Sequence, residues 1–110
     1  MSYSIIPTHR FEKELKRLAK KFPSLKNEFA ELIGDIIKDH VTGTFIGNNC
    51  YKIRMAIASK GKGKSGGARV ITYAYIQTET VYLLTLYDKS EKPDLKPNEL
   101  KEMIDSLALE

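Results

Sequence analysis

The chain of 110 residues has the length of one small domain, and its 42% hydrophobic and 29% charged residues exclude a disordered chain. No apolar run approaches the roughly 18 residues of a membrane-spanning helix and residues 1–4 lack a signal-peptide pattern, so we expect a cytoplasmic protein without membrane contact. The net charge is +4, and the single cysteine, Cys50, excludes an internal disulfide. We therefore expect a single domain over residues 1–110.

The first half of the sequence predicts a short strand and a helical hairpin. Residues 3–6 form a strand candidate that Pro7 ends, and Thr8 can cap a helix. The apolar residues of this helix recur at helical spacing, as do those of a second helix that begins near Ser24. The two sets are Phe11, Leu15, Leu18, Ala19 and Phe22, then Leu25, Phe29, Leu32, Ile33, Ile36 and Ile37.

The second half predicts three more strands and a last helix. Strands are expected over residues 51–57, 69–77 and 81–87, a helix over 100–107, and turns at 41–44 and 47–49. Alternation in the first of these strands places Lys52 and Arg54 on the face opposite to its apolar residues. The order β-α-α-β-β-β-α gives an α+β fold, an antiparallel four-stranded sheet with its helices on one side. The basic residues should emerge on the open face.

Positive charge is concentrated in the middle of the sequence. No acidic residue lies between Asp39 and Glu79, whereas this stretch holds the basic residues Lys52, Arg54, Lys60, Lys62, Lys64 and Arg69. Such segregation favours contact with a polyanion, of which nucleic acid is the commonest. The alternative is a solvated hairpin whose lysines discourage the pairing of sheet edges.

Residues 58–65 satisfy a loose form of the phosphate-binding loop pattern, with Ala58 in place of the first glycine. That loop needs a buried parallel strand before it and a helix that begins at its Lys-Ser pair. Here two glycines follow and then a predicted strand. We therefore expect no nucleotide cofactor, but a basic loop that brings Lys60, Lys62 and Lys64 to a nucleic-acid backbone.

The residue types in the basic segment suit phosphate chemistry without a metal. His9 and His40 lie outside it, Cys50 has no nearby histidine, and the segment has no carboxylates for a two-metal centre, so we expect neither metal nor cofactor. Arginine can stabilise a pentacoordinate phosphorus, lysine can transfer a proton, and RNA supplies its own 2′-hydroxyl nucleophile. Tyr87, close to Lys89, could stack a base, or it could pack the sheet.

Two stretches of the sequence carry a family resemblance. In the first, residues 51–54 are followed by residues 63–73, where a glycine-lysine-serine-glycine-glycine turn precedes an arginine-led strand. In the second, residues 82–92 form a strand with a lysine-bearing end, and residues 94–97 lead into the last helix. Together they resemble the RelE/ParE superfamily of type II toxin–antitoxin toxins, and in particular its HigB-like RelE subgroup. The resemblance extends over nearly the whole chain and implies a RelE-like fold, in agreement with the element order above.

The resemblance implies a ribosome-dependent endonuclease that cuts messenger RNA through attack of the 2′-hydroxyl on the adjacent phosphate. By position, the candidate catalytic residues are Arg69, to stabilise the transition state, and Lys52 or Lys89, to transfer protons. Arg54 and Lys92 match basic positions that are expected to bind RNA, together with the loop lysines and Tyr87. The implied partners are a cognate antitoxin protein, messenger RNA, and the ribosome with its ribosomal RNA.

The sequence departs from the subgroup at Asp88, where a small residue is common, and has no tyrosine after Tyr87, which some RelE toxins use. Asp88 places a negative charge beside the candidate site. One alternative is a ParE-like inhibitor that binds a protein such as DNA gyrase and cuts nothing. Another is a degenerate toxin that acts only as its antitoxin's partner in repression. The presence of the basic set at positions 52, 54, 69 and 89 favours the endonuclease.

Overall fold

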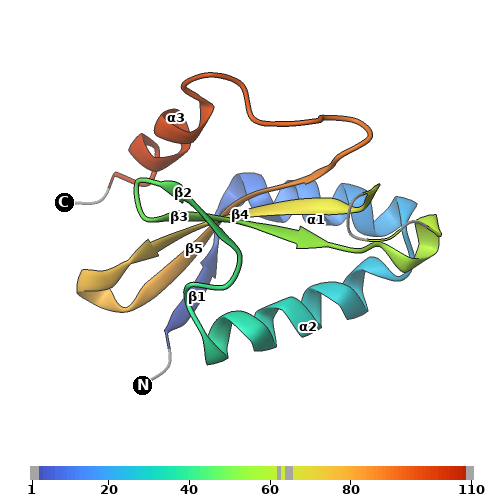
Figure 1. Ribbon diagram of the computed structural model, residues 1–110, viewed down its shortest axis with the longest axis horizontal. Coiled ribbons are helices and arrows are strands. Elements are labelled where there is room, and N and C mark those ends of the chain that lie inside the picture. The colour runs from blue at the N-terminus through green and yellow to red at the C-terminus, as the bar shows by residue number, and fades with distance from the viewer. Residues whose placement is uncertain (1–2, 62, 64–65, 109–110) are drawn as a thin grey trace.

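The computed structural model describes residues 3–61, 63 and 66–108, which form an α+β fold, as the sequence predicts. The strands and helices are β1 (Ser4–Pro7), α1 (His9–Lys21), α2 (Leu25–Lys38), β2 (Thr44–Gly47), β3 (Cys50–Met55), β4 (Ala68–Tyr75), β5 (Thr80–Asp88) and α3 (Glu99–Asp105). Short 3₁₀ helices lie before β4 and β5, at Ala58–Lys60 and Ile76–Thr78. Figure 1 shows the strands gathered in one twisted layer with helices around it.

The described strands form one sheet, in the order β1-β5-β4-β3-β2. Neighbouring strands are antiparallel, except that β1 lies parallel to β5 at one edge. The sheet has five strands and not the predicted four, because residues 44–47 form β2 where we expected turns. This strand has only four residues and ends at a glycine, so it offers too few alternating positions for a sequence pattern. Pairing with Cys50, Tyr51 and Lys52 of β3 holds it in the sheet.

The helical hairpin confirms the spacing of apolar residues in the first third of the sequence. Thr8 caps α1, since its hydroxyl accepts a hydrogen bond from the Phe11 N–H at 3.2 Å and donates one to the Leu83 carbonyl at 2.9 Å. The same residue therefore starts the helix and attaches it to β5. Leu18 of α1 and Leu32 of α2 are buried in the core beneath the sheet.

Helices cover both faces of the sheet, whereas we expected them on one. α1 and α2 pack on one face, where Phe11 and Leu83 belong to the larger core. α3 packs on the other face, in a second core that contains Cys50, Ile71, Leu84, Tyr87 and Met103. Figure 1 shows α2 and α3 on opposite sides of the strands. The reason is that β4 and β5 are largely buried along their length and apolar on both faces, so each face needs a cover.

Residues 89–98, which we call the strap, connect β5 to α3 and cross the α3 side of the sheet (Figure 1). Leu95 packs against the second core, and the Lys92 ammonium pairs with Glu99 at the start of α3. The strap therefore covers part of the sheet face that we expected to be open, and it brings acidic side chains next to the basic residues of that face.

Candidate functional site

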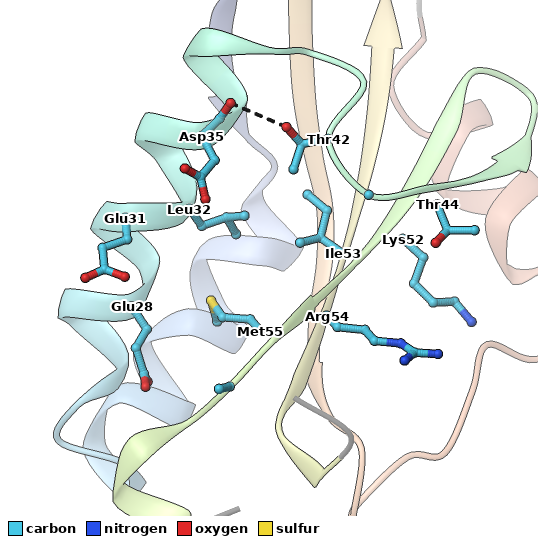
Figure 2. Close-up of a pocket in the computed structure, with 12 residues that line it drawn as sticks. Glu28, Glu31, Leu32, Asp35, Thr42, Thr44, Lys52, Ile53, Arg54 and Met55 are labelled. Carbon is cyan, nitrogen blue, oxygen red and sulfur yellow. Dashed lines mark hydrogen bonds between the residues drawn. The ribbon is translucent and has the colours of Figure 1, made fainter. Parts of the chain in front are cut away.

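Lys52 and Arg54 lie on the α3 side of β3. Strand alternation places them opposite to Ile53 and Met55, which are buried in the core with α1 and α2. Figure 2 shows the four side chains divided in this way, with Ile53 and Met55 directed towards α2 and the two cations directed away from it. Two residues of strand separate the Cα atoms of Lys52 and Arg54 by about 7 Å, so both can reach one segment of a polyanion.

The strand register aligns Arg54, Arg69 and Tyr87 in one row across β3, β4 and β5, which we call the arginine row. Residues that face each other in this way have Cβ atoms about 5 Å apart. Ala68 and Val70, on either side of Arg69, belong to the core that α1 and α2 cover. Because side chains alternate along a strand, Arg69 extends from the opposite face, the same face as Arg54. Two arginines directly opposite each other repel, and an anion between them relieves that repulsion. Paired guanidinium groups of this kind can bind a phosphodiester together, and Arg54 is the exposed member of this pair.

The centre of this row is buried. Only 4% of Arg69 is exposed, and its Nη1 donates a hydrogen bond to the Ala68 carbonyl at 3.1 Å. Tyr87 is also 4% exposed, and its hydroxyl has no hydrogen-bond partner within the part of the chain that the structure describes. Burial raises the pKa of that hydroxyl, and the charge of Asp94 raises it further while the charge of Arg69 opposes the shift. The row thus contains a neutral polar group beside a cation.

The strap covers Tyr87 with its own Lys92, and both residues are among those that we predicted to bind RNA. The Lys92 ammonium lies over the Tyr87 ring, 5.7 Å from its centre. Lys92 also pairs with Glu99, which Arg10 of α1 contacts at 2.6 Å. Because Tyr87 is buried and Lys92 lies on its ring, an RNA base can stack there only after the strap moves.

Lys52 pairs with Asp94 of the strap, and the charge of Lys89 also acts on that carboxylate. The Lys52 ammonium lies 3.1 Å from Asp94 Oδ1. A hydrogen bond from the Leu95 N–H lowers the pKa of Asp94, and so do the hydrogen bond from Lys52 and the charges of Lys52 and Lys89. Lys89 itself is exposed, just after the end of β5. Of the two lysines that we predicted to transfer protons, Lys52 therefore contacts the Asp94 carboxylate and Lys89 acts on it through its charge.

Lys60 lies apart from this group. Its ammonium is 2.6 Å from Asp88 Oδ1 and 5.6 Å from the centre of the Phe22 ring, at the end of α1 on the other side of the sheet. Burial by itself would raise the pKa of Asp88, but hydrogen bonds from Lys60 and Ser90 hold it below its ordinary value. The negative charge that we expected beside the site is therefore compensated and directed away from the arginine row.

The structure thus brings together five of the predicted site residues on one sheet face: Lys52, Arg54, Arg69, Tyr87 and Lys89. Lys62 and Lys64 lie outside the described residues. Sequence reasoning missed Asp94 and Glu99, the acidic partners of Lys52 and Lys92. The only sequence signal for them is that acidic and basic residues are mixed over residues 89–99, which does not say which pairs form.

The described residues do not form a metal site, a membrane-spanning helix, a phosphate-binding loop or a reactive cysteine. Within 3–61, 63 and 66–108, no three His, Cys, Asp or Glu side chains group closely enough to hold a metal ion, and no helix is long and apolar enough to cross a membrane. The segment that resembles a phosphate-binding loop leads into β4, which runs antiparallel to β3. Cys50 is buried, and burial raises the pKa of its thiol to about 12, which keeps it protonated at neutral pH.

A pocket of about 510 Å³ lies between α2 and β3 (Figure 2). Glu28, Glu31 and Asp35 line its α2 wall, whereas Lys52 and Arg54 point away from that wall. A phosphate in this pocket would face three carboxylates, which repel it. The arginine row on the α3 side is therefore the better candidate for binding a polyanion.

Comparison with known proteins agrees with this fold. Residues 9–108 match the family described as the RelE toxin of the RelE/RelB toxin–antitoxin system. The free E. coli toxin RelE, in a mutant form, is 14% identical with a TM-score of 0.62, and the match covers 84% of this chain and 90% of that chain. The intact E. coli RelBE toxin–antitoxin complex is 17% identical with a TM-score of 0.61, covering 79% and 96%. The RelBE2 toxin–antitoxin complex of Mycobacterium tuberculosis is 14% identical with a TM-score of 0.58, covering 80% and 99%.

The fold and the family match together define a toxin of a toxin–antitoxin system. This chain belongs to the RelE toxin family, which confirms the resemblance seen in the sequence. The sequence identity to the solved structures is low, so the similarity to them shows the fold alone. The HigB-like subgroup stays a prediction.

Proposed function

We propose that this toxin is an endoribonuclease that cuts messenger RNA on the ribosome, in the cytoplasm, without a metal ion. The observation that carries the proposal is the pairing of Arg54 with Arg69 directly across two strands, with Lys52 and Lys89 on the same face. A sheet face that places this many cations around one point gains stability when a phosphodiester binds there.

In the proposed reaction the 2′-hydroxyl oxygen attacks the adjacent phosphorus as the bond from phosphorus to the 5′-oxygen breaks. Arg69 and Arg54 stabilise the additional negative charge on the pentacoordinate phosphorus. One of Lys52 and Lys89, as the neutral amine, accepts the 2′-hydroxyl proton, and the other, as the ammonium, donates a proton to the leaving 5′-oxygen. The products are a 2′,3′-cyclic phosphate and a free 5′-hydroxyl. The Tyr87 hydroxyl, which has no partner among the described residues, offers one more donor beside Arg69.

The family also supports a protein partner. Two of the solved structures with this fold are described as toxin–antitoxin complexes, from E. coli and from M. tuberculosis. We extend this to the present chain and propose that a cognate antitoxin binds it and silences its activity. Acidic and apolar side chains of that partner, laid over the basic face, would exclude RNA from the arginine row.

One observation favours a toxin that cuts nothing, which was the alternative drawn from the sequence. Asp94 of the strap pairs with Lys52, and Lys92 of the strap lies over the buried Tyr87, so part of the proposed site is occupied by the chain itself. Such a protein would arrest growth through a protein target such as DNA gyrase, or act only as its antitoxin's partner in repression. The experiment below separates these functions from cleavage.

The test is cleavage of a messenger RNA on purified ribosomes, with the new RNA ends mapped. We expect Arg69→Ala to slow cleavage about 100- to 1000-fold, because removal of one electrostatic stabiliser of a transition state has effects of this size. Since Arg69 is buried, its variant is compared with Arg54→Ala, whose side chain is exposed, and both are checked for folding by circular dichroism.

The matched control is Lys101→Ala, which removes an exposed cation from α3 and should leave the rate unchanged. Unchanged cleavage by folded Arg69→Ala would contradict the role of that arginine. Absence of new RNA ends with the wild-type protein, together with growth arrest in cells, would replace the endonuclease with the non-cleaving toxin.

A further inference from the structure

The ion pair between Lys52 and Asp94 places a carboxylate where an RNA phosphate should bind. Asp94 Oδ1 lies 3.1 Å from the Lys52 ammonium, and the charge of Lys89 also acts on Asp94. A phosphate oxygen that contacts the Lys52 ammonium would lie in the same region. A carboxylate and a phosphodiester each carry one negative charge on oxygen, so they compete for the same cations.

The position of Asp94 is fixed by its neighbour in the strap. Leu95 packs in the second core, and its N–H donates a hydrogen bond to Asp94 Oδ1 at 2.8 Å. The carboxylate is therefore directed towards Lys52 by the hydrogen bond from its half-buried neighbour and not by the ion pair alone.

Exposure distinguishes this ion pair from the pairs at the two ends of the strap, whereas Glu91 in the strap forms exposed pairs with Arg17 and Lys21. The side chains of Asp88 and Glu99 are mostly buried, at 1% and 12% exposure, and these pairs are parts of the packed structure. The Asp94 side chain is 67% exposed, and exposed ion pairs are weak and screened by salt. A bound phosphate can therefore displace Asp94 from Lys52 without unfolding the strap.

We propose that Asp94 is a built-in competitor of the RNA phosphate at Lys52, and that it sets how tightly the basic face binds RNA. The inference rests on the proposed function, since it assumes that Lys52 contacts RNA. Asp94 contacts neither the reacting bonds nor the proposed nucleophile. Its effect therefore falls on RNA affinity more than on the rate of the chemical step.

The test compares Asp94→Asn with the wild-type protein in binding a synthetic single-stranded RNA, measured by fluorescence anisotropy over a series of salt concentrations. Asparagine keeps an oxygen for the Leu95 N–H while removing the charge. We expect the Kd to fall about two- to fivefold at low salt, which corresponds to the strength of an exposed ion pair. The slope of log affinity against log salt should steepen by up to about 0.7, the value for one more phosphate contact. A purely structural role for Asp94 would weaken binding or leave it unchanged.

Asp105→Asn is the matched control, because it also removes an exposed aspartate that pairs with one lysine, Lys101, at 3.0 Å on α3. It corrects for the general gain in net charge. Lys52→Met is the second reference, and Asp94→Asn should have little effect on RNA binding in that background.

The outcomes separate this inference from the proposed function. Tighter binding by Asp94→Asn than by Asp105→Asn, lost when Lys52 is replaced, supports the competitor. Equal binding by the two aspartate variants, while Lys52→Met still weakens binding, overturns it and leaves the RNA site standing. Salt-independent binding that Lys52→Met does not change would overturn both the competitor and the RNA site.

Discussion

Asp88 shows how a single residue can be interpreted wrongly when its partner is unknown. In the sequence it is an acidic residue next to Lys89, at the end of a strand that leads to the candidate site. In the structure its carboxylate contacts Lys60 on the opposite side of the sheet, and Lys60 is held there and not at the arginine row. The pair connects the segment after β3 with the end of β5. Its role is therefore in the packing of these two segments.

We predict that Asp88→Asn lowers the free energy of unfolding by about 3 kcal/mol, because loss of one member of a buried ion pair leaves the other charge uncompensated. Asparagine still accepts the hydrogen bonds of Ser90, so the variant tests the charge alone. Denaturant unfolding followed by circular dichroism measures the change. Replacement of both Asp88 and Lys60 by neutral residues should restore part of the stability.

The exposed Lys101–Asp105 pair provides the comparison for this experiment. Asp105→Asn should change stability by less than about 1 kcal/mol, since exposed ion pairs contribute little. If Asp88→Asn also falls in that range, the buried pair does not hold the two segments together.

At the scale of elements, the long periodic segments were predictable and the short or two-sided ones were not. α1 and α2 have apolar residues at helical spacing over three turns, and β3 alternates, so the expected elements are confirmed. β2 was missed because four residues carry no clear period, and only pairing with β3 defines it. The side on which α3 packs was also wrong, because the second apolar face of β4 and β5 becomes evident only when the strands are paired.

Gly67 is the element-scale feature that matters most for the arginine row. It lies just before β4, and a Cβ at this position would come within 2.2 Å of the Met55 carbonyl oxygen on β3. We predict that Gly67→Ala costs about 2–3 kcal/mol of stability, because backbone must move to make room. It should also weaken RNA binding, since the strands that separate are those that carry Arg54 and Arg69.

Gly34 supplies the matched control. It lies inside α2, and a Cβ there would meet nothing within 4 Å. Gly34→Ala should therefore stabilise the protein by about 0.5–1 kcal/mol through its helix preference and leave RNA binding unchanged. Thermal unfolding and RNA binding of the two variants, measured side by side, check both expectations. Equal behaviour of the two would contradict the close approach at Gly67.

At the scale of the whole molecule, ion pairs hold residues 88–99 to several distant parts of the chain. The carboxylates of this segment pair with Lys60, with Arg17 and Lys21, with Lys52, and with Arg10 and Lys92. These contacts lower the pKa of Asp88, Glu91, Asp94 and Glu99. For Glu99, burial opposes the shift, yet hydrogen bonds from Arg10, Lys92 and the Lys96 N–H lower the pKa to about 2.

We predict that the folded state loses stability as the pH falls from about 4.5 to about 2. A carboxyl with a lowered pKa in the folded state stabilises the fold above its unfolded pKa and loses this effect as it becomes protonated. Glu99→Gln should reduce stability at pH 6 by about 2 kcal/mol and flatten the loss in acid. Thermal unfolding by circular dichroism at a series of pH values gives the result, and parallel curves for the variant and wild type would contradict it.

The candidate site was predictable in its cations and not in its anions. Lys52, Arg54 and Arg69 could be placed on one face because strand alternation and an antiparallel order follow from local pattern. The partners Asp94 and Glu99 depend on how the strap crosses the sheet, which no periodicity in the strap describes. The burial of Tyr87 could not be predicted for the same reason, because Lys92, which covers its ring, belongs to the strap.

The parallel pairing of β1 with β5 affects the order in which the sheet forms when the protein is synthesised. Ser4 faces Thr80, and the hydroxyl of Thr8 is bonded to the carbonyl of Leu83, 75 residues further on. Because β1 precedes β5 in the chain, it leaves the ribosome first and has no partner in the sheet until β5 has also emerged. Contacts so distant in sequence form late and slowly. The arginine row depends on the same late strand. The face that we propose to bind RNA is therefore complete only after β5 has joined the sheet.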